Sequence, residues 1–180
     1  MKVNVTACLA GVFLLMTAEM SVAAEVIDLS HQPLSFLQTL QPETVVKELS
    51  KKVDFNRTTH TRVYQTYAGY PVWGSDAIFH ANAELKMNDM NGIFYRGLKQ
   101  DLANTPHYVF TAAQATKALK AAVQHTRQRV SEKFTTTDEQ TKLVVYVDHL
   151  KQAHWAFEVK FKTSRIKGLP AIPITLIDAV

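Results

Sequence analysis

The chain has 180 residues, of which 47% are hydrophobic and 20% charged, with 6 Gly, 6 Pro, one Cys and a formal net charge of +4. This composition excludes a disordered, collagen-like or low-complexity chain, because enough apolar side chains are present to bury a core. The length suits one domain or two small ones. The mild positive charge fits either a solvated surface or a surface that meets an acidic partner.

The first 24 residues have the pattern of a secretory signal peptide. Lys2 precedes an apolar run over residues 5–16, and small residues follow at 21–24. The run is shorter than the roughly 20 residues that span a bilayer. We expect cleavage after Ala23 or Ala24, and a mature chain in the periplasm or outside the cell with no membrane anchor. Cys8 leaves with the signal, which excludes a disulfide, a thiol nucleophile and a thiolate metal site.

The start of the mature chain predicts an irregular segment and then a helix. Residues 25–40 have no clear period. Residues 42–52 predict a helix, because Pro42 and Glu43 suit a first turn and the two lysines at its end suit a last one. The face of this helix would carry Val46, Leu49 and Val53.

Residues 58–98 predict an antiparallel meander, because aromatic and β-branched residues recur between turn signals. An Asn-Gly pair is among these signals, since Gly readily takes positive φ. The predicted segments are a strand at 62–67, a turn at 68–71, a strand at 76–84, a turn at 88–92 and a strand at 93–98.

The second half begins after a polar stretch at 99–107. Thr111 and Gln114 form a capping box at the start of a predicted helix that runs to about Thr126. The segments predicted after it are a loop at 135–138, a strand at 143–147, a turn at 148–152, a strand at 153–162 that buries Trp155, Phe157, Val159 and Phe161, and a central strand at 172–179. The sequence therefore predicts an α+β fold of two small units, residues 25–104 and 105–180, each an antiparallel sheet with a packed helix.

Catalytic motifs are absent from the sequence. None of the seven histidines is followed by Glu, which excludes the His-Glu-x-x-His zinc motif, and there is no Gly-x-Ser-x-Gly elbow or phosphate loop. His149 and His154 are spaced poorly for a metal. We expect no catalytic residue, metal site, cofactor or nucleic-acid partner in this chain, and we interpret His60 and His80 as hydrogen-bonded structural residues.

One stretch resembles the fungalysin/thermolysin propeptide domain. The family pattern is roughly His-x-Arg-x-x-Gln-x-x-x-Gly-x-Pro-Val-x-Gly, followed by a strand that ends in His. Tyr64 stands where the family often has a first Gln. The matching positions are His60, Arg62, Gln65, Gly69, Pro71, Val72, Gly74 and His80.

The second half resembles, more loosely, the PepSY domain that follows in such precursors. The matching segments are the helix at 111–126 and the strands at 143–146, 155–159 and 177–179. The whole resemblance covers about residues 30–180 and implies two cystatin/PepSY-like units. It implies the pro-region of a secreted thermolysin-like zinc metalloprotease, which acts as intramolecular chaperone and inhibitor of the zymogen. The implied partner is the catalytic domain, and zinc would belong only to that domain.

The resemblance also implies roles for single residues. Gly69 and Pro71 would fix a turn. Arg62 and Gln65 would either bind the protease or brace the meander, and we favour bracing because polar partners inside small sheets usually stay internal. Trp73 is either an interface aromatic or a core residue.

Related pro-regions continue beyond an Ile-Asp-Ala segment with a turn, a short strand, a linker and the cleavage junction, whereas the sequence given ends at Val180. We therefore expect assistance in folding to be retained better than inhibition, because such a linker would occupy the active-site cleft. Two alternatives stay open. The chain is either a free-standing exported protease-inhibitor module or a fragment of a zinc metalloendopeptidase precursor, and a downstream His-Glu-x-x-His motif would decide for the precursor.

Overall fold

The computed structural model describes residues 24–40, 42–84, 86–102, 110–130, 133–165 and 169–179. The predicted signal peptide up to Ala23 and the predicted unit boundary at 104/105 lie outside these residues. The elements are β1 (Glu25–Asp28), the 3-10 helices η1 (Leu29–His31) and η2 (Leu34–Thr39), β2 (Thr44–Val53), β3 (Thr59–Tyr67), β4 (Tyr70–Ala81), β5 (Met87–Arg96), α1 (Leu98–Leu102), α2 (Ala112–Arg129), β6 (Phe134–Val147), β7 (Ala153–Arg165) and β8 (Ile174–Asp178).

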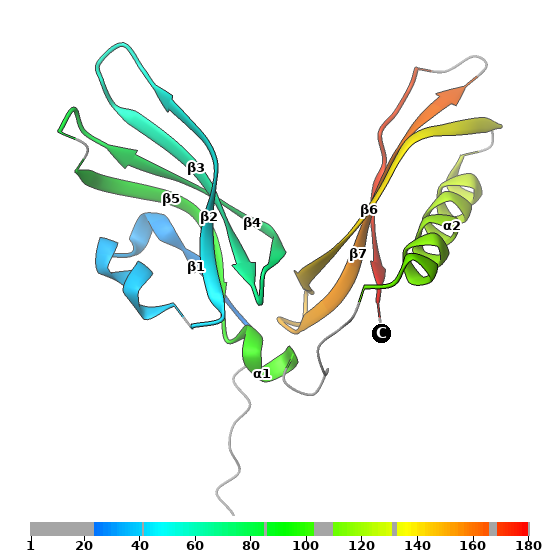
Figure 1. The fold of residues 1–180 in the computed structure, drawn as a ribbon, viewed down its shortest axis with the longest axis horizontal. Helices are drawn as coiled ribbons and strands as arrows, with labels where there is room; N and C mark the ends of the chain where they lie inside the picture. The colour runs from blue at the N-terminus through cyan, green and yellow to red at the C-terminus, as the bar shows by residue number, and fades with distance from the viewer. Residues whose placement is uncertain are drawn as a thin grey trace, which may run out of the picture.

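The molecule has two wings, and the predicted α+β class is confirmed. Figure 1 shows a first wing of β1–β5 on the left and a second wing of β6–β8 with α2 on the right, with α1 at the base between them. The N-terminal segment and α2 lie on the outer sides of the two wings. The predicted irregular segment at 25–40 contains β1, which pairs with β5, and two 3-10 helices.

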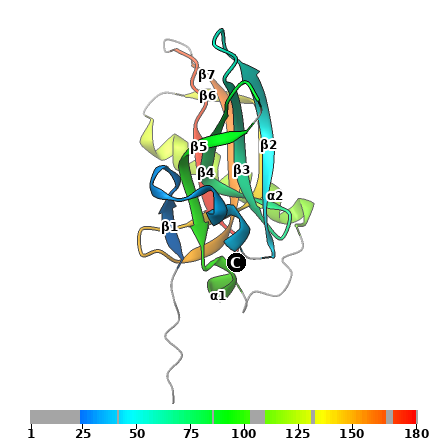
Figure 2. The same cartoon turned by 90° about the vertical axis from the view of Figure 1, so that its left-hand side faces the viewer.

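The first wing is an antiparallel sheet in the order β2-β3-β4-β5-β1. One face carries the apolar side chains, and the N-terminal segment lies in front of this sheet in Figure 2. The two 3-10 helices therefore cover the apolar face of this sheet, the place where the sequence predicts an α-helix. The buried cluster beneath them consists of Ile27, Leu29, Phe36, Val63, Ala77, Phe79, Met90 and Phe94.

The predicted helix over residues 42–52 is wrong, because this segment is strand β2. It pairs with β3 from Thr44↔Tyr67 to Val53↔Thr59, with a bulge between Glu48 and Ser50. Val46 packs against the buried cluster, whereas Leu49 and Val53 of the expected helix face are exposed. An isolated helix of this length is marginal, and the free backbone edge of β3 supplies a ladder of hydrogen bonds instead.

The predicted turn at 88–92 is also wrong, because β5 runs through it. The chain reverses at Asn82, whose side-chain Oδ1 accepts hydrogen bonds from the backbone N–H groups of Glu84 and Lys86. Gly92 does have a positive φ of 123°. It uses that freedom inside the strand, because a Cβ there would lie 2.4 Å from the carbonyl oxygen of Asp76.

The second wing packs α2 against the sheet β6-β7-β8. The predicted helix cap is confirmed, since Thr111 Oγ1 accepts from Gln114 N at 3.3 Å. The predicted alternation in β7 is confirmed as well. Its buried side chains are Trp155, Phe157, Val159 and Phe161.

Two further predictions in this wing are wrong. The expected loop at 135–138 belongs to β6, which continues past a bulge between Thr137 and Gln140. A bulge accommodates the extra residue, and Asp138 has a positive φ of 54°. The expected central strand at 172–179 is β8, which pairs with β7 and forms one end of the described sheet. Its Ile174 is exposed, because the core behind α2 reaches only its other face.

The wings share one core at the base. Val72 of β4 pairs in parallel with Val145 of β6, which joins the strands into one sheet. Trp155 contacts Tyr70 of the first wing edge-on, with ring centroids 5.3 Å apart. The buried members of this cluster outside the second wing are Ala24, Tyr67, Val72, Leu98 and Leu102. The position of β4 in the sheet therefore fixes one wing against the other.

Candidate functional site

The motif positions lie on one hairpin. His60, Arg62 and Gln65 are on β3, and the positions from Pro71 to His80 are on β4. Gly69 lies in the tight turn between the two strands with a φ of 87°. The next turn residue is Tyr70, which already pairs with Tyr67. The motif residues are therefore spaced as two antiparallel strands require, with Gly69 in the left-handed conformation at the turn between them.

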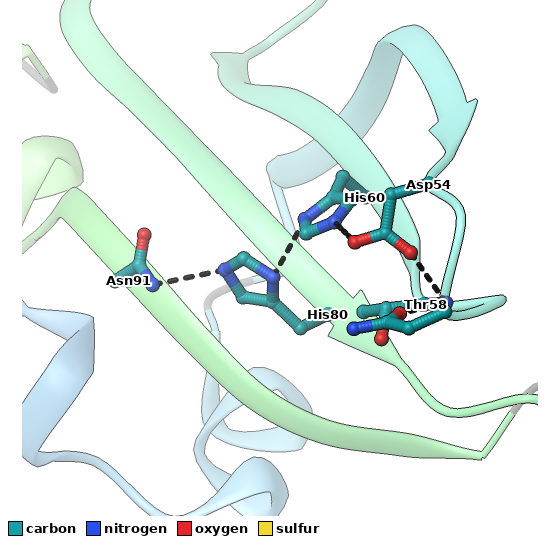
Figure 3. Close-up of polar contacts among 6 residues, drawn as sticks. Asp54, Thr58, His60, His80 and Asn91 are labelled. Carbon is teal, nitrogen blue, oxygen red and sulfur yellow. Dashed lines mark hydrogen bonds and ion pairs between the residues drawn. The ribbon is translucent and has the colours of Figure 1, made fainter.

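A chain of polar contacts crosses three strands on the open face of the first wing (Figure 3). His60 Nδ1 lies 2.9 Å from His80 Nδ1, His60 Nε2 lies 3.0 Å from Asp54 Oδ2, and Asn91 Nδ2 lies 3.0 Å from His80 Nε2. One proton assignment satisfies all three contacts. The Asn91 amide donates to His80, His80 Nδ1–H donates to His60, and His60 Nε2–H donates to the Asp54 carboxylate.

Asp54 joins this network to the β2–β3 turn. Its Oδ1 accepts from the backbone N–H of Thr58 at 2.9 Å, while its Oδ2 accepts from His60. The hydrogen bond from His60 is the main reason why the pKa of Asp54 lies below its usual value, and the Thr58 amide adds to the effect. Sequence reasoning missed Asp54 and Asn91. The Asp-x-Asn turn signal at 54–56 was available for the first of them.

Gln65 is fully buried, and its side chain hydrogen-bonds to the backbone of β5. Its side-chain Nε2 donates to Tyr95 O at 2.6 Å, and its Oε1 accepts from Tyr95 N at 2.8 Å. The backbone N–H of Gln65 donates to Ser75 Oγ, whose hydroxyl donates to Val72 O at 2.6 Å. Arg62 points instead to the exposed face, 3.7 Å from Asp76.

Trp73 lies in a groove between the wings. Its side chain is 41% exposed and meets Tyr146 of β6 edge-on at 5.8 Å between ring centroids. The groove has a volume of ≈ 440 Å³. Its polar wall includes Lys142 and Glu158, which form an ion pair at 3.2 Å. The residues around it are Leu49, Tyr64, Pro71, Val72, Trp73, Gly74, Asp76, Lys142, Val144 and Glu158.

In the part of the chain that the structure describes, no group of three or more His, Cys, Asp or Glu side chains is arranged so that it could hold a metal ion. His154 lies 3.1 Å from Asp148 across the β6–β7 turn. Within the same residues, no helix is both long and apolar enough to cross a membrane.

Comparisons with known proteins agree with this geometry. The fungalysin/thermolysin propeptide motif matches residues 47–94, which run from β2 to β5. The chain is 33% identical over 140 residues to the zinc metalloproteinase MspA of Legionella longbeachae, covering 73% of this chain and 25% of that protein. It is 33% identical over 139 residues to a zinc metalloproteinase of Legionella pneumophila, covering 73% of this chain and 24% of that protein.

The match therefore spans about a quarter of the length of these curated relatives. The sequence of this chain contains no His-Glu-x-x-His, and the family that matches is named for a propeptide. The matched part is thus not a catalytic domain. These findings identify the β2–β5 sheet as a fungalysin/thermolysin propeptide motif, in a chain similar to the propeptide region of thermolysin-like zinc metalloproteinases.

Proposed function

We propose that this chain binds the catalytic domain of a thermolysin-like zinc metalloproteinase, assists its folding and keeps it inactive until processing. The observation that carries the proposal is the propeptide motif at 47–94, in a chain whose curated relatives are zinc metalloproteinases. Zinc would be held by the catalytic domain.

The physical basis is mass action. A surface that binds the native catalytic domain and not its unfolded chain stabilises the native state. Such a surface works best when it is ordered before binding, because less conformational entropy is then lost. The buried amide of Gln65 and the contacts of His60 and His80 keep the first wing ordered. The exposed groove around Trp73 supplies a preformed concave surface at the base.

Refolding in trans tests the proposal. The denatured catalytic domain of the Legionella pneumophila relative is diluted into buffer with or without the full chain, and active protease is measured after the chain has been removed. We expect the active yield to rise with chain concentration and to saturate. We also expect the chain to lower the peptidase activity of the native domain. No gain in yield together with no binding would contradict the proposal.

We infer export from the N-terminal pattern, and the fold supports a cut after Ala23. The side chain of Ala24 is fully buried in the core that the two wings share, and β1 begins at Glu25. Cleavage after Ala24 would remove a core residue. N-terminal sequencing of the exported chain should therefore show Ala24 as its first residue, whereas a start at Glu25 would contradict this assignment.

A further inference from the structure

The hairpin between β2 and β3 carries a fully exposed aromatic residue at its tip. Phe55 is 100% exposed, and the neighbouring Val53 is exposed as well. This tip lies at the far end of the first wing, away from the base where the wings meet (Figure 1). It is therefore separate from the groove around Trp73. Among the residues that the structure describes, no side chain covers Phe55, which leaves the whole ring available to a partner.

The tip is ordered although it is exposed. Asp54 N donates to Thr58 O at 3.0 Å and Arg57 N donates to Asp54 O at 3.1 Å. Thr58 N donates to the side chains of both Asp54 and Asn56. Asp54 is held in turn by His60, which is tied to His80 on the next strand. The histidines thus act as positioning residues for the turn that presents Phe55, and an ordered aromatic loses little entropy on binding.

The surroundings of Phe55 are cationic. Lys51, Lys52 and Arg57 are exposed within four residues of it. The carboxylate of Asp54 is engaged by His60 and Thr58 and faces back into the hairpin. The tip therefore presents the apolar side chain of Phe55 beside three exposed cationic side chains, which we call the positive rim. The complementary surface is an apolar pocket that carboxylates border.

We propose that Phe55 inserts into an apolar pocket with an acidic rim on the protease catalytic domain, as an anchor separate from the groove at the base. This inference rests on the proposed function. An anionic lipid surface shares part of the required chemistry. One aromatic side chain buries too little apolar area for stable membrane anchoring, whereas a single aromatic in a pocket often dominates a protein interface.

The test compares Phe55→Ser with Leu150→Ser in the full chain. Leu150 is a matched control, because it is 64% exposed in the turn between β6 and β7. Binding to the catalytic domain of the Legionella pneumophila relative is measured by surface plasmon resonance. We expect Phe55→Ser to raise Kd about 30-fold and Leu150→Ser to change it less than about twofold. Neither variant should alter the thermal unfolding midpoint of the free chain, because both side chains are exposed.

Charge reversal provides a second variant. The double substitution Lys52→Glu and Arg57→Glu should slow association and weaken its dependence on salt, because the positive rim steers the encounter. If the parent chain binds the catalytic domain and Phe55→Ser changes the Kd by less than twofold, this inference is overturned and the proposed function is not. A parent chain that does not bind the catalytic domain would overturn the proposed function and this inference with it. If Phe55→Ser abolishes binding to phosphatidylglycerol vesicles but leaves the Kd for the catalytic domain unchanged, Phe55 binds an anionic lipid surface and the proposed protein pocket is ruled out.

Discussion

At the scale of single residues, the side chain of Gln65 supplies hydrogen-bond partners to the part of β5 that β4 no longer pairs with. The β4–β5 pairing ends at Ala77↔Gly92, so the backbone of Tyr95 lies beyond it. The Gln65 amide satisfies both the N–H and the carbonyl group of Tyr95. This buried contact explains physically why a polar residue stands at this position of the motif.

Replacing Gln65 with Leu should destabilise the chain by about 2–4 kcal/mol, because the partly buried N–H and C=O groups of Tyr95 would both lose their partners. Urea unfolding followed by circular dichroism measures this free energy. Gln124→Leu is the matched control on the exposed face of α2, and we expect it to change stability by less than about 0.5 kcal/mol. Equal effects of the two substitutions would contradict the bracing role of Gln65.

Asp54 predicts a dependence of stability on pH. Its pKa is lower in the folded chain than its ordinary value of 3.8, chiefly because His60 donates a hydrogen bond to it. Ionised Asp54 therefore stabilises the fold above pH 3.8, and this stabilisation is lost as the pH falls through the lowered folded value. The difference in unfolding free energy between the parent and Asp54→Asn should shrink from pH 7 to below pH 3.8.

A double-mutant cycle isolates the cause of this pH dependence. In a His60→Ala background, Asp54→Asn should have a smaller effect at pH 7, because the principal donor to the carboxylate is gone. The same effect in both backgrounds would show that His60 does not stabilise the Asp54 carboxylate.

At the scale of elements, two glycines with positive φ have different consequences. Gly92 lies in β5 with a φ of 123°, where an added Cβ would lie 2.4 Å from Asp76 O and 2.6 Å from Ala77 Cα. Gly69 has a φ of 87° in the β3–β4 turn, and a Cβ there would meet nothing within 4 Å. A side chain introduced at Gly92 would therefore cause steric strain as well as conformational strain, whereas one at Gly69 would cause conformational strain alone.

Substitution by Ala should separate these two contributions. Gly69→Ala should cost about 1–2 kcal/mol, the penalty for a left-handed L-residue. Gly92→Ala should cost about 3 kcal/mol or more, because it also forces β4 and β5 apart. Thermal unfolding of both variants under one buffer condition measures the difference. A Gly92→Ala variant as stable as Gly69→Ala would contradict the close approach of the two strands.

At the scale of the whole molecule, the two wings should unfold together. Tyr67 and Tyr70 of the first wing pack on Trp155 of the second, and Val72 pairs with Val145. Unfolding either wing would expose this shared core, which makes a half-folded state costly.

In a Trp73→Phe variant, urea unfolding followed by Trp155 fluorescence should therefore have the same midpoint as unfolding followed by far-ultraviolet circular dichroism, which reports the strands of both wings. The Trp73→Phe substitution removes the second emitter, and Trp73 is not part of the shared buried core. Two separated midpoints would show that the wings are independent domains.

Several parts of the fold could be predicted from the sequence because their causes are local. The cap of α2 depends on Thr111 and Gln114, three residues apart. The alternation in β7 depends on a period of two over residues 155–161. The motif that the family match confirms at 47–94 includes residues whose spacing sets the β3–β4 turn at Gly69.

Other parts could not be predicted, because their causes lie elsewhere in the chain. Asn91 joins the candidate site through His80, eleven residues before it in sequence and beside it only once β4 and β5 have paired. The exposure of Phe55 depends on where the hairpin ends relative to the packed face of the sheet. Neither fact has a signature in the local sequence.

The sequence by itself determined the signal-like start, the helix at the capping box and the likeness to a propeptide, since each depends on residues close together along the chain. Only the tertiary structure decided that residues 44–53 form a strand, that Gly92 serves a close approach of two strands, and that the two wings share a core around Trp155. The physical reason is that local preferences of about 1 kcal/mol or less per residue yield to long-range backbone pairing and burial, which a distant segment supplies.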